Sequence, residues 1–161
     1  MTLFRLVVSM SLDIPGFLAF KEVPAYLQLF ERLKEKAAKL RPQILLVDGN
    51  GIMHTRQFGC ACHIGVLTDI PSVGVGKTVF AVDGLTQDSV KSLCERYLSK
   101  AGDVIELIGK SGKVWGAALR ITEREMEAVI VSQGHKVSLK TALKIVKDSI
   151  YKQRIPEPVS C

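Results

Sequence analysis

Residues 44–51 read Ile-Leu-Leu-Val-Asp-Gly-Asn-Gly, and they are the most informative stretch for the architecture. The four apolar residues have the length of a strand that is covered on both faces of a sheet. Asp48 follows at once, and two glycines flank Asn50, a composition typical of a turn. The stretch therefore predicts a buried strand that ends in a carboxylate, at the place where ligands bind in open α/β sheets.

The residues before this strand predict a strand, a turn and a helix. Leu6 to Ser11 suggests a strand, which the turn residues Asp13 to Gly16 break. From Pro24 to Leu40 apolar residues recur at intervals of three and four with charged residues between them, which indicates an amphipathic helix. Pro42 is expected to end that helix.

The residues after the central strand continue the alternation. The small residues from Gly59 to Leu67 predict a tightly packed helix, Ser72 to Val75 a short buried strand, and Asp88 to Lys100 another helix. The chain has no internal repeat or linker, so residues 1–161 are expected to form one α/β or α+β domain. The remaining predicted elements are a hairpin of Ile105 to Ile108 with Val114 to Leu119, a strand Val129 to Val131 leading to His135, and a final helix capped by Ser138.

The composition fits a basic globular protein. The 161 residues carry 22 Lys and Arg against 16 Asp and Glu, a net charge of +6, and the mean hydropathy is +0.21. A basic chain favours a polyanionic partner without requiring one. No apolar run approaches the roughly 20 residues of a membrane span, so we expect no membrane association. Four cysteines without paired spacing predict reduced thiols and an intracellular protein of the cytoplasm or nucleus.

Two sequences imitate known sites and are excluded. Gly76-Lys77-Thr78 resembles the end of a phosphate-binding P-loop, but Pro71 stands where the first glycine is required, so a nucleotide triphosphatase is excluded. Cys60-Ala-Cys62-His63 lacks the second pair of ligands that a structural zinc site needs.

Three side chains have both a chemical and a structural interpretation. Asp48 can hold a hard cation at the strand end, or it can cap the amides of a tight turn. Glu22 lies just before the helix expected at Pro24, so it can face that strand end or be a solvated first-turn glutamate. His135 can position water or exchange a proton, or it is an ordinary helix-entry histidine.

The run from Leu46 to Gly51, which continues through Cys62 to Leu67 and Gly74 to Lys77, closely resembles the signature stretch of endonuclease V, a nuclease that recognises hypoxanthine. The similarity extends from about Val8 to Pro158. Further matching segments are Gly16 to Glu22, Gly116 with Ala118 to Arg120, and Ser132 to His135.

This resemblance implies an RNase H-like mixed sheet flanked by helices, in which Asp48 and Glu22 bind Mg²⁺ or Mn²⁺ with a third carboxylate from the first strand. That third residue lies upstream of the segment resembling Leu6 to Ser11, so we expect this chain to lack it, together with the first strands of the family fold. Asp13 falls in the following loop and does not replace it. Severely reduced cleavage is therefore expected.

The resemblance also implies residues that contact nucleic acid. Lys77 resembles the lysine at the scissile phosphate, and His135 the histidine near the metal. The family loop matching Leu12 to Pro15 usually carries an aromatic wedge, which is absent here, so we expect a preference for single strands. The implied nucleic-acid-binding residues are Ile14, Pro15, Gly16, Gly49, Asn50, Gly51, His54, Arg56, Gly59 and His63.

The sequence thus predicts a monomeric, metal-dependent endonuclease that cuts near inosine or deoxyinosine in single-stranded RNA or DNA. One alternative is a non-catalytic module that binds inosine-containing nucleic acid. Another is a basic α/β domain without a nucleic-acid role.

Overall fold

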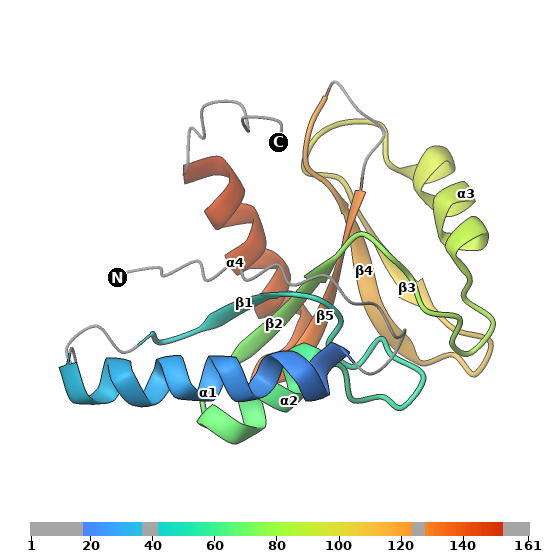
Figure 1. The fold of residues 1–161 in the computed structure, drawn as a ribbon. Helices are drawn as coiled ribbons and strands as arrows, with labels where there is room; N and C mark the ends of the chain where they lie inside the picture. Colours follow the sequence, from blue (N-terminus) through green and yellow to red (C-terminus); the bar gives the residue numbers. More distant parts are fainter. Residues whose placement is uncertain (1–17, 37–41, 124–127, 153–161) are drawn as a thin grey trace, which may run out of the picture.

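The computed structural model describes residues 18–36, 42–123 and 128–152 (Figure 1). The predicted strand Leu6 to Ser11 and the implied nucleic-acid-binding residues Ile14, Pro15 and Gly16 lie outside the described residues. The described elements are α1 (Leu18–Lys36), β1 (Leu45–Asp48), α2 (Cys60–Thr68), β2 (Ser72–Gly76), α3 (Gln87–Tyr97), β3 (Val104–Ile108), β4 (Val114–Arg120), β5 (Ala128–His135) and α4 (Leu139–Lys152).

The five strands form one mixed sheet in the order β1-β2-β5-β4-β3. β1 and β2 are parallel, and α2 makes the crossover that a parallel pair requires. All other neighbouring strands are antiparallel. Within the described part of the chain, β1 forms an edge of the sheet and pairs only with β2.

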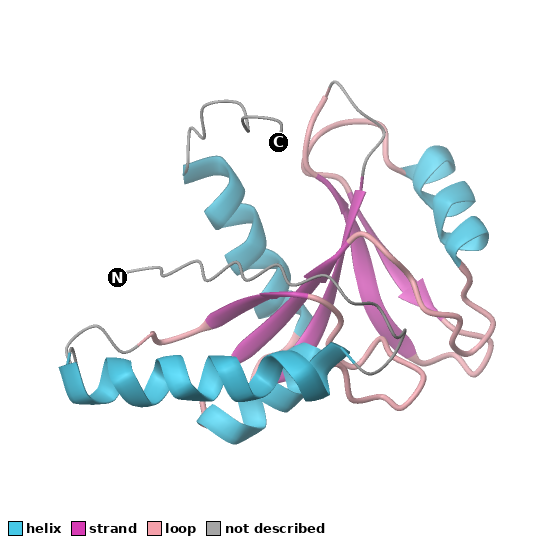
Figure 2. Ribbon diagram, viewed as in Figure 1, coloured by secondary structure: helices cyan, strands magenta, loops and turns pink. Residues whose placement is uncertain are grey.

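Helices cover both faces of the sheet, as Figure 2 shows. Successive side chains of a strand point to opposite faces. On β5, Ile130 joins the core beside α3, whereas Val131 joins the core beside α4. On β1, Leu45 packs with α1 and α2, whereas Leu46 faces the α4 side. The helices α1, α2 and α3 therefore lie on one face and α4 lies on the other.

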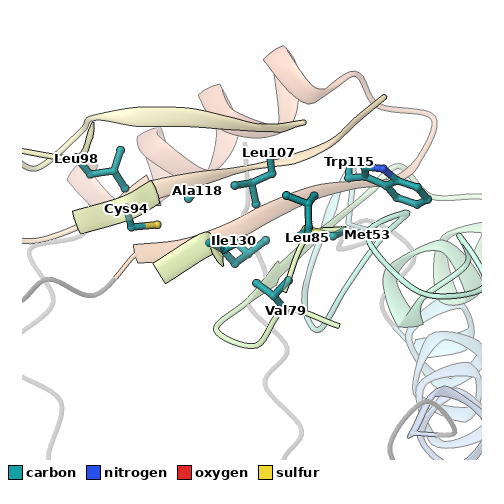
Figure 3. Close-up of a cluster of buried hydrophobic side chains, with 10 residues drawn as sticks. Met53, Val79, Leu85, Cys94, Leu98, Leu107, Trp115, Ala118 and Ile130 are labelled. Carbon is teal, nitrogen blue, oxygen red and sulfur yellow. The ribbon is translucent and has the colours of Figure 1, made fainter. Parts of the chain in front are cut away.

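The core beside α3 is the largest of the three apolar clusters (Figure 3). Leu107 of β3 and Met53 of the loop after β1 are fully buried in it, and Trp115 of β4 is 5% exposed. Met53 therefore anchors the loop between β1 and α2 in the core.

The first helix differs from the prediction. It begins at Leu18 and ends at Lys36, so Pro24 lies inside it and Glu22 is in its second turn rather than before it. The prediction took Pro24 as an early helical residue, because proline is best tolerated where no N–H is needed. In the structure the missing N–H of Pro24 leaves one interior helical hydrogen bond unmade.

The later elements agree with the prediction within a few residues, except that β5 is longer. It runs on to His135, beyond the predicted Val129 to Val131, with a register shift opposite Ser72 and Val73 of β2. The predicted cap of the final helix is confirmed, since the Ser138 hydroxyl accepts a hydrogen bond from the Thr141 N–H at 3.2 Å. Among the described helices, none is both long and apolar enough to cross a membrane.

Candidate functional site

β1 and β2 end at the same edge of the sheet, and each carries a predicted site residue there. Asp48 is the last residue of β1, is exposed, and pairs with Val75 of β2. Lys77, also exposed, follows the last residue of β2. Since parallel strands point the same way, the carboxylate of Asp48 and the ammonium of Lys77 lie at one edge. The structure thus brings together two of the four predicted catalytic residues.

Glu22, the third of them, lies on α1, and only its backbone is described. Tyr26, one turn further along, packs in the same apolar cluster as Leu45 and Val47 of β1. Helix α1 therefore packs in the apolar cluster that includes β1. Among the described side chains, no group of three His, Cys, Asp or Glu residues could hold a metal ion. The described donors at this edge therefore comprise the carboxylate of Asp48, a ligand type that Mg²⁺ accepts, and do not by themselves complete a cation site.

His135, the fourth, lies near the other end of β2. In the sheet it pairs with Ser72, three residues before the partner of Asp48, which corresponds to about 10 Å along the strand. Its Nε2 is 3.4 Å from Oδ1 of Asp69, and Lys136 forms an ion pair with the same carboxylate. The hydrogen bonds from Lys136 and His135 lower the pKa of Asp69. The structure does not bring His135 to the edge that carries Asp48.

The side chain of Asn50 connects the ends of β1 and β2. Its Nδ2 donates a hydrogen bond to the main-chain oxygen of Thr78 at 3.5 Å, which ties the turn after Asp48 to the segment that carries Lys77. Asn50 is 8% exposed, and its Oδ1 has no hydrogen-bond partner among the described residues. Buried polar atoms are nearly always paired, so this acceptor is an exception that needs a reason.

The glycines around Asn50 allow backbone to pack on backbone. A Cβ at Gly51 would lie 1.9 Å from the carbonyl oxygen of Gln133, and one at Gly59 would lie 2.2 Å from that of Asn50. Gly49 has a φ of +149°, which side chains rarely adopt. The resemblance implies that Gly51 and Gly59 bind nucleic acid, and in this structure the protein's own packing also requires both glycines.

Hydrogen bonds fix the loop that joins β1 to α2, residues 49–59, across the sheet. The Gly51 N–H donates to the Ser132 hydroxyl at 2.8 Å, and the Ile52 N–H donates to the Gln133 carbonyl at 2.7 Å. On the way back to α2, the Gly59 N–H donates to the Gly51 carbonyl at 3.0 Å. The loop is therefore a rigid extension of the Asp48 turn.

Three implied nucleic-acid residues of this region have different surroundings. His54 is 6% exposed, with its ring 5.3 Å from that of Phe80 and its Nδ1 accepting the Arg56 main-chain N–H. Burial, and secondarily the charge of Arg56, lower the pKa of His54. His54 therefore supports the loop from inside, whereas Arg56 is exposed and His63 is half-buried.

Two further side chains lie on this surface that no pattern in the sequence indicated. Phe58 is 47% exposed beside His63, with ring centroids 5.9 Å apart. Lys113, in the turn between β3 and β4, donates a hydrogen bond to Oε1 of Gln57 at 2.7 Å. That bond joins residues 56 positions apart in the chain, so no local pattern indicates it. For Phe58, the available sequence signal was an aromatic residue directly before a glycine.

Comparison with known proteins identifies a family. Residues 6–161 match the family model described as Endonuclease V. The human protein Endonuclease V is 48% identical over 146 residues, which are 91% of this chain and 51% of that protein. The mouse protein of the same name is 45% identical and is covered to 43%. The chain thus spans about half the length of these curated relatives.

Solved structures give the same result. The crystal structure of human ENDOV matches with a TM-score of 0.80 at 47% identity, over 92% of this chain and 62% of that one. Endonuclease V of Ciona intestinalis, in complex with a 24mer DNA containing an inosine followed by a ribo-adenosine, matches with a TM-score of 0.78 at 35% identity, over 87% and 60%. These neighbours have an RNase H-like fold, which confirms the α/β mixed sheet expected from the sequence.

Proposed function

Because the chain belongs to the endonuclease V family, we propose that it binds single-stranded RNA or DNA containing inosine or deoxyinosine and hydrolyses a nearby phosphodiester bond. One observation carries the proposal: Asp48 and Lys77 lie at the same edge of the sheet, at the ends of parallel strands. The complex of the Ciona intestinalis relative with inosine-containing DNA supports the same substrate class.

In this proposal Asp48 and Glu22 hold Mg²⁺ or Mn²⁺. A bound divalent cation supplies an activated water and neutralises charge on the phosphate. Lys77 binds a phosphate oxygen and stabilises the negative charge that develops there during hydrolysis. Mg²⁺ binds few protein groups, so its retention depends on each of these carboxylates.

Recognition of the nucleic acid falls to the loop that joins β1 to α2. The exposed guanidinium of Arg56 binds the backbone phosphates, and His63 contacts the nucleotide from the first turn of α2. His54 keeps the loop in shape by packing against Phe80. Asn50 holds the turn against the segment of Lys77.

A second candidate is a non-catalytic module that binds inosine-containing nucleic acid. It needs Arg56 and the loop that joins β1 to α2, but no cation. In that case inosine-containing RNA binds but is not cut.

Cleavage of an inosine-containing single-stranded RNA in Mn²⁺ separates these candidates. We expect slow cleavage by the wild-type chain, none with Asp48→Ala, and a rate at least about tenfold lower with Lys77→Ala, as for loss of one charged transition-state contact. Glu106→Ala removes an exposed carboxylate of β3 and should leave the rate unchanged. Metal-dependent product that persists with Asp48→Ala contradicts the catalytic proposal, and tight binding without any product supports the second candidate.

A further inference from the structure

Phe58 is an exposed aromatic residue on an otherwise fixed loop. Its side chain is 47% exposed, and its ring lies 5.9 Å from that of His63 at an angle of 48°. Single exposed apolar residues are common on proteins and by themselves indicate nothing. Phe58, however, lies beside a second ring, His63, and on a loop with basic side chains. Aromatic rings together with basic side chains are typical of surfaces that bind single-stranded nucleic acid.

The backbone of Phe58 is held beside the Asp48 turn. The next residue, Gly59, donates its N–H to the carbonyl of Gly51 at 3.0 Å and lies so close to Asn50 that no side chain fits there. The Phe58 ring is therefore presented from a backbone that packs on the turn after Asp48. A rigid ring loses little conformational entropy when a base stacks on it.

Two basic side chains belong to or contact the loop that carries Phe58. Arg56 is exposed two residues before it. Lys113 reaches the same loop, because its Nζ is 2.7 Å from Oε1 of Gln57 and 4.1 Å from the centroid of the Trp115 ring. Trp115 is fixed in turn by a 2.8 Å hydrogen bond from its Nε1 to Oδ2 of Asp83.

Asp83 is the acidic side chain at this turn, and its own contacts occupy it. Its carboxylate accepts hydrogen bonds from the Ser111 hydroxyl and main-chain N–H and from Trp115. The hydrogen bonds from Ser111 and Trp115 lower the pKa of Asp83. The Asp83 carboxylate is therefore occupied by these bonds, whereas Lys113 donates its hydrogen bond to Gln57. The loop of Phe58 thus carries an exposed arginine, Arg56, and is contacted by a lysine, Lys113.

We propose that Phe58 and His63 form a stacking platform for a nucleobase next to the inosine, and that Arg56 and Lys113 bind the phosphates on either side of that base. This inference rests on the proposed function for its substrate class. Stacking on an aromatic ring accepts any base, so the platform contributes affinity and not selectivity for inosine. It also gives the chain an aromatic contact that Leu12 to Pro15 lacks.

Binding of a fluorescein-labelled single-stranded RNA, followed by fluorescence anisotropy at low salt, tests the platform. Phe58→Ala should weaken binding about tenfold, within the range for loss of one stacked base. Phe58→Trp should retain wild-type affinity, and Phe58→Leu, which keeps apolar volume without a π face, should behave like the alanine variant. Tyr97→Ala is the matched control, because Tyr97 is a 54% exposed aromatic residue beside Arg96 on α3.

The charged part of the platform has its own readout. Lys113→Ala should lower the slope of log Kd against log salt by about 1, as expected for one lost phosphate contact. Lys91→Ala removes an exposed lysine of α3 and should leave the slope unchanged. Thermal melting of every variant shows whether a loss of affinity follows a loss of folding.

Matched RNAs with inosine or guanosine at one position distinguish the two proposals. Preference for inosine tests the proposed function, whereas weakening by Phe58→Ala with both RNAs tests the platform. Equal affinity of the wild type, Phe58→Ala and Phe58→Leu overturns the platform even if inosine is preferred. A platform effect without inosine preference overturns the proposed specificity and leaves the platform standing. Absence of binding to either RNA at low salt overturns both.

Discussion

At the carboxyl end of β2, Asp48 and Lys77 are exposed, whereas at its amino end polar side chains bond to neighbouring groups of the protein. At the amino end, the Ser72 hydroxyl donates to the Ala61 carbonyl at 2.6 Å and accepts the His135 N–H at 2.9 Å. Between the two ends the turn after Asp48 packs on backbone, because a Cβ at Gly51 would overlap the carbonyl of Gln133, which pairs with Val73. The two ends thus differ in the surroundings of their polar groups.

The difference separates a site for a ligand from a structural contact. At the amino end, Asp69, Lys136 and His135 satisfy one another. At the carboxyl end, Asp48 and Lys77 are exposed at the edge, and Asn50 keeps a buried acceptor without a described partner. These surroundings support the proposal that the chemistry takes place at the Asp48 end, and the catalytic role expected for His135 stays a prediction.

The largest expected effect comes from adding a methyl group at the packed turn. Gly51→Ala should lower the free energy of unfolding by about 3 kcal/mol or more, because its Cβ would overlap the Gln133 carbonyl. Gly76→Ala is the control from the same edge, since its Cβ would lie 3.7 Å from Asn50 Oδ1, and a change within about 0.5 kcal/mol is expected. Urea denaturation measures both. Equal stability of the two variants would contradict the inference that the turn at Gly51 is closely packed.

A smaller effect comes from removing the two buried serine hydroxyls. Ser132→Ala leaves the Gly51 N–H without its acceptor, and Ser72→Ala leaves the His135 N–H without its acceptor. One unpaired buried group costs about 1–3 kcal/mol, so the two variants should lose similar amounts of stability. Binding of inosine-containing RNA by the folded protein should weaken only with Ser132→Ala. If Ser72→Ala weakens RNA binding as much, the amino end also belongs to the site.

The smallest effect is the pH dependence of stability. Burial lowers the pKa of His54 below its ordinary 6.5, so the unfolded chain takes up this proton first. The free energy of unfolding should therefore fall as pH drops below about 6.5, and His54→Gln should flatten that slope. Lys136 and His135 lower the pKa of Asp69 below its ordinary 3.8, so its contribution persists above that pH and is lost only in stronger acid.

Denaturation of wild type, His54→Gln and Asp69→Asn from pH 8 to pH 2 separates these two windows. If Asp69→Asn, and not His54→Gln, removes the loss of stability near pH 6.5, the assignment of that window to His54 is wrong.

The sequence predicted elements whose signals are local. The apolar run before Asp48, the small-residue helix of Cys60–Thr68 and the hairpin at Gly109 to Gly112 each depend on neighbouring residues, and each is confirmed. The start of α1 was misjudged because Pro24 favours a first-turn position but does not forbid an interior one.

The parts that escaped prediction depend on contacts between distant residues. The position of His135 follows from the register of β5 on β2, including its shift at Ser72, which a single strand does not encode. The packing of Gly51 on Gln133 and the bond from Lys113 to Gln57 likewise join segments that are far apart in the chain. The spacing of the glycines indicated an unusual turn. It did not indicate whether the space beside these glycines is filled by the protein's own backbone or by a ligand.

The Oδ1 of Asn50 has no hydrogen-bond partner among the described residues, and stability and recognition place opposite demands on such an acceptor. A buried acceptor without a donor costs about 1–3 kcal/mol, and an apolar side chain of similar shape, such as leucine, avoids that cost. Selection for heat resistance alone would therefore replace Asn50, together with the link between Asp48 and Lys77. If Asn50 is retained under such selection only when nucleic-acid binding is also required, then the turn gives up stability in return for function.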